Sequence, residues 1–265
     1  MTQSRRALLA LLPLLPVLTT ARGLAAQPLA APATPGAAAP SPAAPPPPLT
    51  ARLVHGGAPW RLRARVMEVP EKVLHLGFRG PGAPEAEIIL PRPMGTAGRL
   101  RVVAMGGRQV VLASVEGNTG TGLSQRLVVF IGCDAEERLR IIGIESRAAQ
   151  EAMQCTSETV LENRLQADGQ GGLRVHSSFA RTRGDCGQQW TGKPYREAWT
   201  DRLTWDGRGP IGGLAVTRGA GPVRRAVVEA RRRVAEQLGA APVTDLRNVD
   251  LEATGLYALV TTQAP

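Results

Sequence analysis

Three cysteines and three histidines are the residues of this chain best suited to redox, nucleophilic or metal chemistry. They are Cys133, Cys155, Cys186, His55, His75 and His176. No two of the six are closer than 10 positions in the sequence, whereas structural metal sites commonly pair ligands about two to five positions apart. The sequence therefore predicts no metal site.

Cys155 and Cys186 are predicted to form a disulfide. The Gly-rich segment Asp168–Gly172 lies midway between them and is suited to a hairpin turn, which would bring both cysteines to the open end of one strand pair. Such a bridge would stabilise the fold by about 3–4 kcal/mol in the chain-entropy model. Cys133 ends an apolar run and is predicted to be a buried, small apolar residue. A nucleophilic site that joins Cys133 to a histidine stays open as an alternative.

Aromatic residues gather in one segment after Cys186. Trp190, Tyr195, Trp199 and Trp205 are four of the nine aromatic residues of the chain, and charged residues alternate with them. Aromatic faces beside polar groups can stack sugar rings or hold an apolar ligand, so these four residues are the candidate ligand-binding residues. The alternative is that they fill a core otherwise built from Val, Ala and Leu.

Other catalytic motifs are not present in the sequence. The loop Gly117–Gly122 lacks the Gly-Lys-Ser/Thr ending of a phosphate-binding P-loop, and Gln125 stands where a dinucleotide motif requires glycine. No G-x-S-x-G motif of serine hydrolases occurs. His75 and His176 lie in strand-like patterns, which favour structural roles. We therefore name no catalytic residue, expect no cofactor, and favour a protein that is not an enzyme.

Residues 1–26 are predicted to be an export signal. Arg5 and Arg6 form its basic start, Ala7–Leu18 its apolar stretch, and Gly23-Leu24-Ala25 a cleavage region of small residues. Both the general secretory route and the twin-arginine route fit this pattern. Residues 27–50 are almost wholly Ala and Pro, which predicts a disordered, semi-rigid linker. We therefore expect a periplasmic or secreted protein.

The net charge predicts the kind of partner. The chain has a formal charge of +10, and only two of its 32 basic residues are lysines. A basic protein outside the cytoplasm favours anionic envelope components, which include lipid headgroups, lipopolysaccharide and cell-wall glycan. Nucleic acid is not expected in that compartment, and no membrane span follows residue 26. The sequence leaves the oligomeric state open.

Residues 51–265 are predicted to form a single globular, mainly β (α+β) domain. Short apolar runs rich in β-branched residues recur every 8 to 20 positions, and Gly106-Gly107 and Asp168–Gly172 are typical hairpin turns. The expected strands are Trp60–Val69, Val73–Phe78, Ala86–Leu90, Leu100–Met105, Gln109–Val115, Leu127–Ile131, Leu139–Ile144, Val160–Leu165, Leu173–Phe179 and Leu256–Thr261. This order indicates an antiparallel meander, for which a barrel and propeller-like blades between residues 99 and 180 both remain open.

One amphipathic helix is expected at residues 222–238. Pro222 suits a first helical position and Gly239 a C-terminal cap. The apolar residues recur at helical spacing, and the charged residues fall on the opposite side. The apolar residues are Val223, Val227, Ala230, Val234 and Leu238; the charged ones are Arg225, Glu229, Arg232, Arg233 and Glu236. We expect the apolar side to pack on the sheet, with binding to a membrane surface as the alternative.

Together these patterns predict an exported bacterial envelope protein that acts as a binding or structural module rather than as an enzyme. The alternative is a cell-envelope hydrolase with a site near residues 190–205.

Overall fold

The computed structural model describes residues 49–54, 57–67, 73–80, 82, 85–91, 99–120, 122–153, 157–183, 193–212, 215 and 218–260. Contacts divide the chain into two units, residues 1–45 and 46–265. Every described residue belongs to the second unit.

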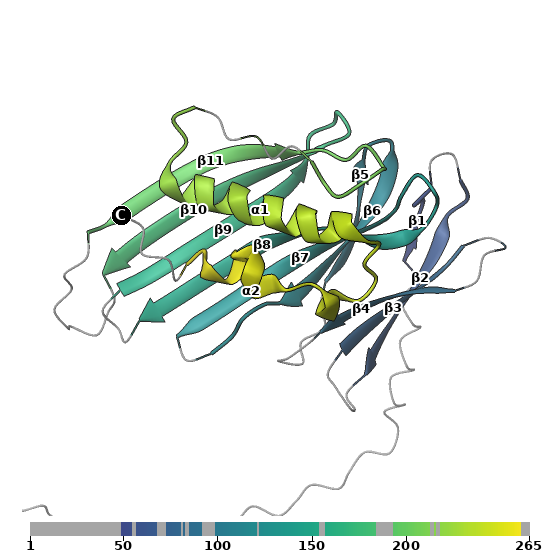
Figure 1. The fold of residues 1–265 in the computed structure, drawn as a ribbon, viewed down its shortest axis with the longest axis horizontal. Coiled ribbons are helices and arrows are strands. Elements are labelled where there is room, and N and C mark those ends of the chain that lie inside the picture. The colour runs from purple at the N-terminus through teal and green to yellow at the C-terminus, as the bar shows by residue number, and fades with distance from the viewer. Residues whose placement is uncertain are drawn as a thin grey trace, which may run out of the picture. The chain divides into compact units, whose positions relative to one another are not determined.

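The described residues form two antiparallel sheets (Figure 1). The first sheet contains β1 (Thr50–Ala51), β2 (Trp60–Met67), β3 (Val73–Arg79) and β4 (Ala86–Pro91). The second contains β5 (Leu100–Met105), β6 (Arg108–Glu116), β7 (Leu123–Cys133), β8 (Leu139–Met153), β9 (Ser157–Ala167), β10 (Leu173–Arg183) and β11 (Tyr195–Leu203). Within each sheet, strands that are consecutive in the chain pair with each other. The predicted mainly β meander is confirmed.

The second sheet is continuous, and no closed barrel is found among the described strands. The hairpins predicted between residues 99 and 180 are therefore consecutive parts of one sheet rather than separate propeller blades. The turn between β5 and β6 lies beside the turn between β9 and β10, because the Gly106 N–H donates to the Gly171 carbonyl at 2.8 Å. Gly106 has a φ of +60°, and a Cβ there would meet the Trp205 carbonyl. Only glycine fits both the turn and this close approach.

Strands β8 and β9 pair along only part of their lengths. Their ladder joins Ala148–Met153 to Ser157–Glu162; beyond it β8 pairs with β7, and β9 pairs with β10. The register of β7 against β8 shifts between Arg126 and Leu127, which leaves Arg147 as the extra residue of a bulge. A bulge bends and twists its strand. The second sheet therefore opens between β8 and β9, with Arg147 at the point of separation.

Helix α1 (Pro222–Ala240) and the short helix α2 (Leu251–Thr254) lie on one face of the second sheet (Figure 1). The predicted helix is confirmed, but it continues past Gly239, and Ala241 is its C-cap. The five residues of the predicted apolar stripe are all buried. On the opposite side Glu229 contacts Arg232 and Arg233. No helix of the described ranges is long and apolar enough to cross a membrane.

The expected and observed elements differ most in the C-terminal third. Residues Leu256–Ala258 form the 3-10 helix η2 rather than the predicted strand Leu256–Thr261, because Gly255, with φ +79°, ends α2 and begins another helical turn. A further 3-10 helix, η1 (Leu246–Asn248), precedes α2. Strand β11, which was not predicted, occupies most of the aromatic segment.

The buried apolar residues form two clusters. The larger cluster joins the first sheet, one side of the second sheet and α1, and it includes Leu76, Leu127 and Val227. The smaller cluster includes Phe130, Val175 and Trp205. The run Leu127–Ile131 contributes alternate residues to the two clusters, so the predicted burial of this strand on both sides is confirmed.

Candidate functional site

The predicted aromatic ligand residues do not form one surface in the described part of the chain. Trp205 is 3% exposed in the smaller cluster, where its indole N–H donates to the Gly209 carbonyl at 2.8 Å. Trp199 and Tyr195 pack against the larger cluster instead. The Tyr195 ring contacts Phe179 edge-on. Trp190 lies outside the described residues, so its role as a ligand residue stays a prediction.

Charged residues are buried beneath α1. The Arg231 guanidinium donates to Glu145 of β8 at 2.6 Å and to Asp201 of β11 at 2.5 Å. Asp201 also accepts from Arg224 at 3.0 Å and from the Trp199 indole at 2.9 Å. Because two carboxylates meet two guanidinium groups, this buried cluster has no net charge. It ties α1 to two strands that are far apart in the sequence.

The environment of this cluster raises the pKa of both Arg231 and Glu145. Burial lowers the pKa of Arg231, but Glu145 and Asp201 outweigh burial and hold it above its usual range. Burial raises the pKa of Glu145, and Arg231 only partly opposes that shift. Asn163 of β9 completes the cluster by donating to Glu145 at 3.1 Å and to the Ser146 carbonyl at 2.6 Å. The adjoining cavity of about 20 Å³ has room for little more than a water molecule.

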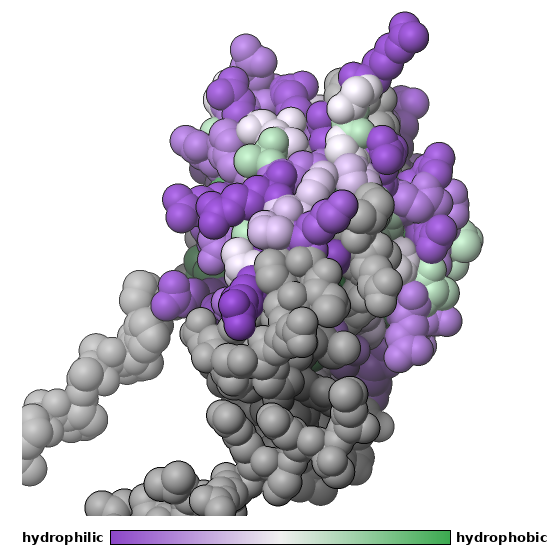
Figure 2. All heavy atoms as spheres, turned by 90° about the vertical axis from the view of Figure 1, so that its left-hand side faces the viewer, coloured by the Kyte–Doolittle hydropathy of each residue, from purple (hydrophilic) through white to green (hydrophobic). Residues whose placement is uncertain are grey.

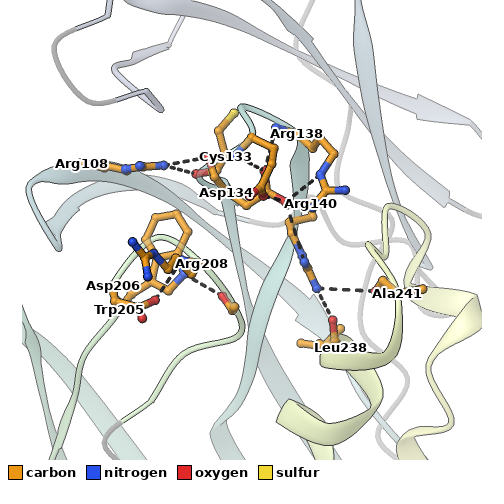
Figure 3. A network of polar contacts seen from close by, with 12 residues as sticks. Arg108, Cys133, Asp134, Arg138, Arg140, Trp205, Asp206, Arg208, Leu238 and Ala241 are labelled. Carbon is orange, nitrogen blue, oxygen red and sulfur yellow. Dashed lines mark hydrogen bonds and ion pairs between the residues drawn. The ribbon is translucent and has the colours of Figure 1, made fainter.

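Both ends of α1 are held by charged side chains of the sheet. At the N-terminus the Glu197 carboxylate accepts from the Val223 and Arg224 N–H groups, both at 3.1 Å. At the other end the Arg140 guanidinium donates to the Leu238 and Ala241 carbonyls (Figure 3). A negative charge at the start and a positive charge at the end both complement the helix dipole. These charges hold α1 in place on the sheet.

A second polar network surrounds the turn between β7 and β8 (Figure 3). The buried Asp134 carboxylate accepts from the Glu136 and Arg138 N–H groups and from the Arg138 guanidinium, at 2.9–3.1 Å. Arg108 donates to the Cys133 and Asp134 carbonyls at 2.7 and 2.8 Å and lies over the Trp205 ring. Burial raises the pKa of Asp134, but Arg138 outweighs it and holds the pKa below its usual range. All of these donors serve protein acceptors, which gives the network a structural role.

Cys133 is buried beside this turn as a free thiol. Burial raises the pKa of the Cys133 thiol to about 12, and the neighbouring Asp134 adds to that shift. A thiol of this kind is almost wholly protonated near neutral pH and is a poor nucleophile. Its environment matches the predicted small apolar residue rather than the Cys–His alternative.

Cys155 and Cys186 lie outside the described residues, so their disulfide stays a prediction. The hairpin on which it rests is present: β9 and β10 are joined by a turn at Asp168–Gly172, and Ser157 pairs with Arg183 at the open end. The Asp168 carboxylate accepts from the Gly172 and Gln170 N–H groups at 2.8 and 2.7 Å and from Arg202 at 2.5 Å. These contacts explain why the turn forms where the sequence indicated it.

The described histidines are far apart in the fold. His75, in the first sheet, contacts Glu87 at 3.0 Å. His176, in the second, contacts Thr200 at 3.0 Å. His55 lies outside the described residues. Among the residues described, no group of three metal-ligating side chains is found.

Arginines from four strands gather where β8 separates from β9. We call Arg101 (β5), Arg126 (β7), Arg147 (β8) and Arg164 (β9) the arginine cluster. Arg126 pairs with Ala148, which pairs with Glu162, so these three residues form one row across the sheet. Arg164 follows Glu162 by two positions and therefore shares its side of β9. The Arg101 guanidinium donates to the Leu165 carbonyl at 3.3 Å, which places Arg101 beside β9.

The positive charge of the arginine cluster is poorly neutralised. Arg101, Arg126 and Arg164 are exposed, and Arg147 is half-buried. Within the described ranges, no carboxylate forms an ion pair with any of the four. Burial lowers the pKa of Arg147, as do the charges of Arg101, Arg126 and Arg164, and only Glu162 opposes them. At this site several like charges converge without an ion pair among the described residues, and it is the candidate functional site.

Sequence reasoning missed this cluster because its members are up to 63 positions apart and depend on the bulge at Arg147. The basic excess of the chain was the available signal, but it does not say which arginines converge. Figure 2, seen from the left-hand side of Figure 1, shows mostly hydrophilic side chains on the described residues. Among the described residues of that view, polar side chains predominate over apolar ones.

Comparison of the chain with protein families, with curated proteins and with solved structures found no match.

Proposed function

We propose that this protein is an exported envelope module, not an enzyme, that binds anionic membrane surfaces through its arginine cluster. The phosphate groups of phospholipids or lipopolysaccharide would supply the negative charge. The observation that carries the proposal is the convergence of four unpaired arginines on one spot of the second sheet. One guanidinium group can donate two parallel hydrogen bonds to a phosphate group, so arginines suit this partner.

The two faces of the β9–β11 region support this assignment. Helix α1 covers one face and is fixed there by the buried charges. The alternate residues of β9, including Arg164 of the cluster, are exposed on the opposite face. A rigid sheet with exposed arginines suits contact with an extended charged surface. The predicted export signal and the Ala/Pro-rich linker would place such a module in the envelope, separated from the cleaved N-terminus by a spacer.

The hydrolase alternative receives less support from the geometry. Near Trp199, the half-buried Glu197 accepts from the first turn of α1, whereas Asp201 and Glu145 are 6% and 1% exposed. Both are bonded to Arg231. A carboxylate that acts as a general acid or base must reach its substrate. With α1 in place, neither of these two can.

Vesicle flotation tests the proposal. We expect the protein to float with vesicles of phosphatidylcholine and phosphatidylglycerol but not with phosphatidylcholine alone, and added salt should weaken binding because it screens exposed charges. A triple variant, Arg126→Gln, Arg147→Gln and Arg164→Gln, should lose this binding. The matched control, Arg61→Gln, Arg79→Gln and Arg196→Gln, removes the same charge from other exposed positions and should retain most of it. Equal losses in both variants, or no binding by the wild type, would contradict the proposal; binding to acidic glycan alone would replace the lipid with another partner.

A further inference from the structure

We infer that the arginine cluster contains a discrete oxyanion site for one phosphate group, with Arg147 at its centre and Glu162 as the carboxylate that competes with the bound anion. This inference rests on the proposed function and goes beyond it, because diffuse attraction to a charged surface requires no such site. The phosphate could belong to a lipid headgroup or be free in solution.

The bulge is the first observation behind this inference. Because Arg147 is the extra residue between two paired positions, its backbone lies outside the regular ladder. Below it, the Asn163 side chain rather than the backbone of β9 bonds the Ser146 carbonyl. The sheet thus opens at Arg147, which is the only half-buried member of the cluster. Bulges commonly redirect a side chain at a functional site.

The second observation is the convergence of charge on Arg147. The charges of Arg101, Arg126 and Arg164 lower the pKa of Arg147, and the charge of Glu162 opposes them. The four guanidinium groups, Glu162 and Glu116, which pairs with Arg126 across the strands, leave a net charge of about +2 at this spot, since arginine stays protonated in proteins. A phosphate dianion would neutralise most of that charge and could accept hydrogen bonds from several guanidinium groups at once.

Arg202 provides a contrast within the same sheet. Its guanidinium is held by the Asp168 carboxylate at 2.5 Å and donates to the Gln170 carbonyl at 3.2 Å. An arginine that serves the fold is paired in this way. Glu162 lies in the same row as Arg126, with Ala148 between them, and shares the side of Arg164, yet the structure gives it no ion pair with either. The carboxylate therefore lowers the local charge without saturating the donors, as a competitor would.

Titration calorimetry with inorganic phosphate tests the site on the purified protein. Arg147→Gln should weaken phosphate binding at least about tenfold, because a charged hydrogen-bond donor is lost. Glu162→Gln should tighten it about threefold, because one nearby negative charge is removed. Arg147→Lys keeps the charge but loses the bidentate guanidinium, so its affinity for phosphate should lie between those of the wild type and Arg147→Gln. Arg196→Gln, an exposed arginine on β11, is the matched control and should change binding by less than about twofold.

The source of the phosphate is decided by a second measurement. Vesicles that contain phosphatidic acid are compared with inorganic phosphate for the wild type, Arg147→Gln and Arg196→Gln. Parallel losses with both probes support a site that recognises the phosphate group itself. A loss with vesicles but no binding of free phosphate supports the same site with a lipid headgroup as its ligand. Thermal melting should show that all variants remain folded.

The discrete site can fail while the proposed function holds, or both can fail together. If anionic vesicles bind the wild type but Arg147→Gln and Arg196→Gln lose affinity equally, and Glu162→Gln changes nothing, the discrete site is wrong and the charged surface remains. If the wild type binds neither vesicles nor phosphate, both are wrong.

Discussion

Arginines on the two faces of the second sheet have opposite environments. On the side covered by α1, Arg231 is 4% exposed and bonded to two carboxylates. On the other side, Arg126 and Arg164 are exposed and have no ion pair. Both groups consist of the same residue type, but Arg231 belongs to α1, whereas Arg126 and Arg164 belong to the second sheet. Burial decides the difference, because a buried charge must be paired whereas an exposed charge is solvated by water.

The comparison indicates which arginines serve the fold and which are available to a partner. Removing one member of a buried pair leaves the other charge unpaired and destabilises the protein. Removing an exposed arginine from a cluster of like charges relieves repulsion and costs little. Stability and binding should therefore respond to different substitutions, and the following predictions use that separation.

The largest effect is expected for Arg231→Met. Methionine fills a similar volume but leaves Glu145 and Asp201 buried without their shared partner, which should lower the free energy of unfolding by about 3–5 kcal/mol. Urea denaturation measures this change. Arg232→Met, one position along α1 and exposed, is the matched control and should cost less than about 0.5 kcal/mol. Similar losses for the two variants would mean that the buried pairing does not stabilise the helix.

A smaller loss is expected at the open end of the β9–β10 hairpin. Cys155→Ser should lower the free energy of unfolding by about 3–4 kcal/mol under oxidising conditions if it removes the predicted disulfide, which is at or below the Arg231→Met effect. Cys186→Ser should do the same, and reducing agent should abolish the difference from the wild type. Cys133→Ser should be less damaging and independent of reducing agent. Equal losses for all three variants would refute the pairing of Cys155 with Cys186. Anion binding well below the melting temperature should not change.

Much of the fold could be predicted because its determinants are local. Gly106-Gly107 and Asp168–Gly172 specify turns by their own backbone preferences, and the valines of α1 repeat at helical spacing. The helix pattern also contained an unused signal: Arg231 lies four positions after Val227 and three before Val234, on the buried stripe. A charge at such a position predicts a buried partner.

The candidate site could not be predicted in the same way. Arg101, Arg126, Arg147 and Arg164 become neighbours only through the strand register, the bulge in β8 and its separation from β9. None of these follows from local propensity, and one residue of slip would move a side chain to the other face. The aromatic segment is the opposite case, because Trp199 and Trp205 are close in sequence but pack against different clusters.

An intermediate effect is expected for Asp134→Asn, and it depends on pH. The pKa of Asp134 is lowered in the folded state, so its contribution to stability is present above the unfolded pKa of about 4 and is lost as the pH falls below it. Near neutral pH, Asp134→Asn should lower the free energy of unfolding by about 1–3 kcal/mol, because buried hydrogen bonds are weakened. Thermal melts from pH 6 to pH 3 should show a shallower decline for the variant than for the wild type. Parallel declines would contradict the assigned role of Asp134.

The smallest effect on stability, and the sharpest contrast with Arg231, is expected for Arg147→Gln. Since Arg147 is surrounded by three other arginines and has no ion pair, its replacement should change the free energy of unfolding by less than about 0.5 kcal/mol or raise it slightly. The same substitution should nevertheless weaken anion binding more than any stability effect could explain. Urea denaturation at low and high salt measures the first quantity, and salt should reduce any gain by screening the repulsion that the substitution removes. A loss comparable to that of Arg231→Met would show that Arg147 serves the fold, and the distinction between the two arginine groups would then fail.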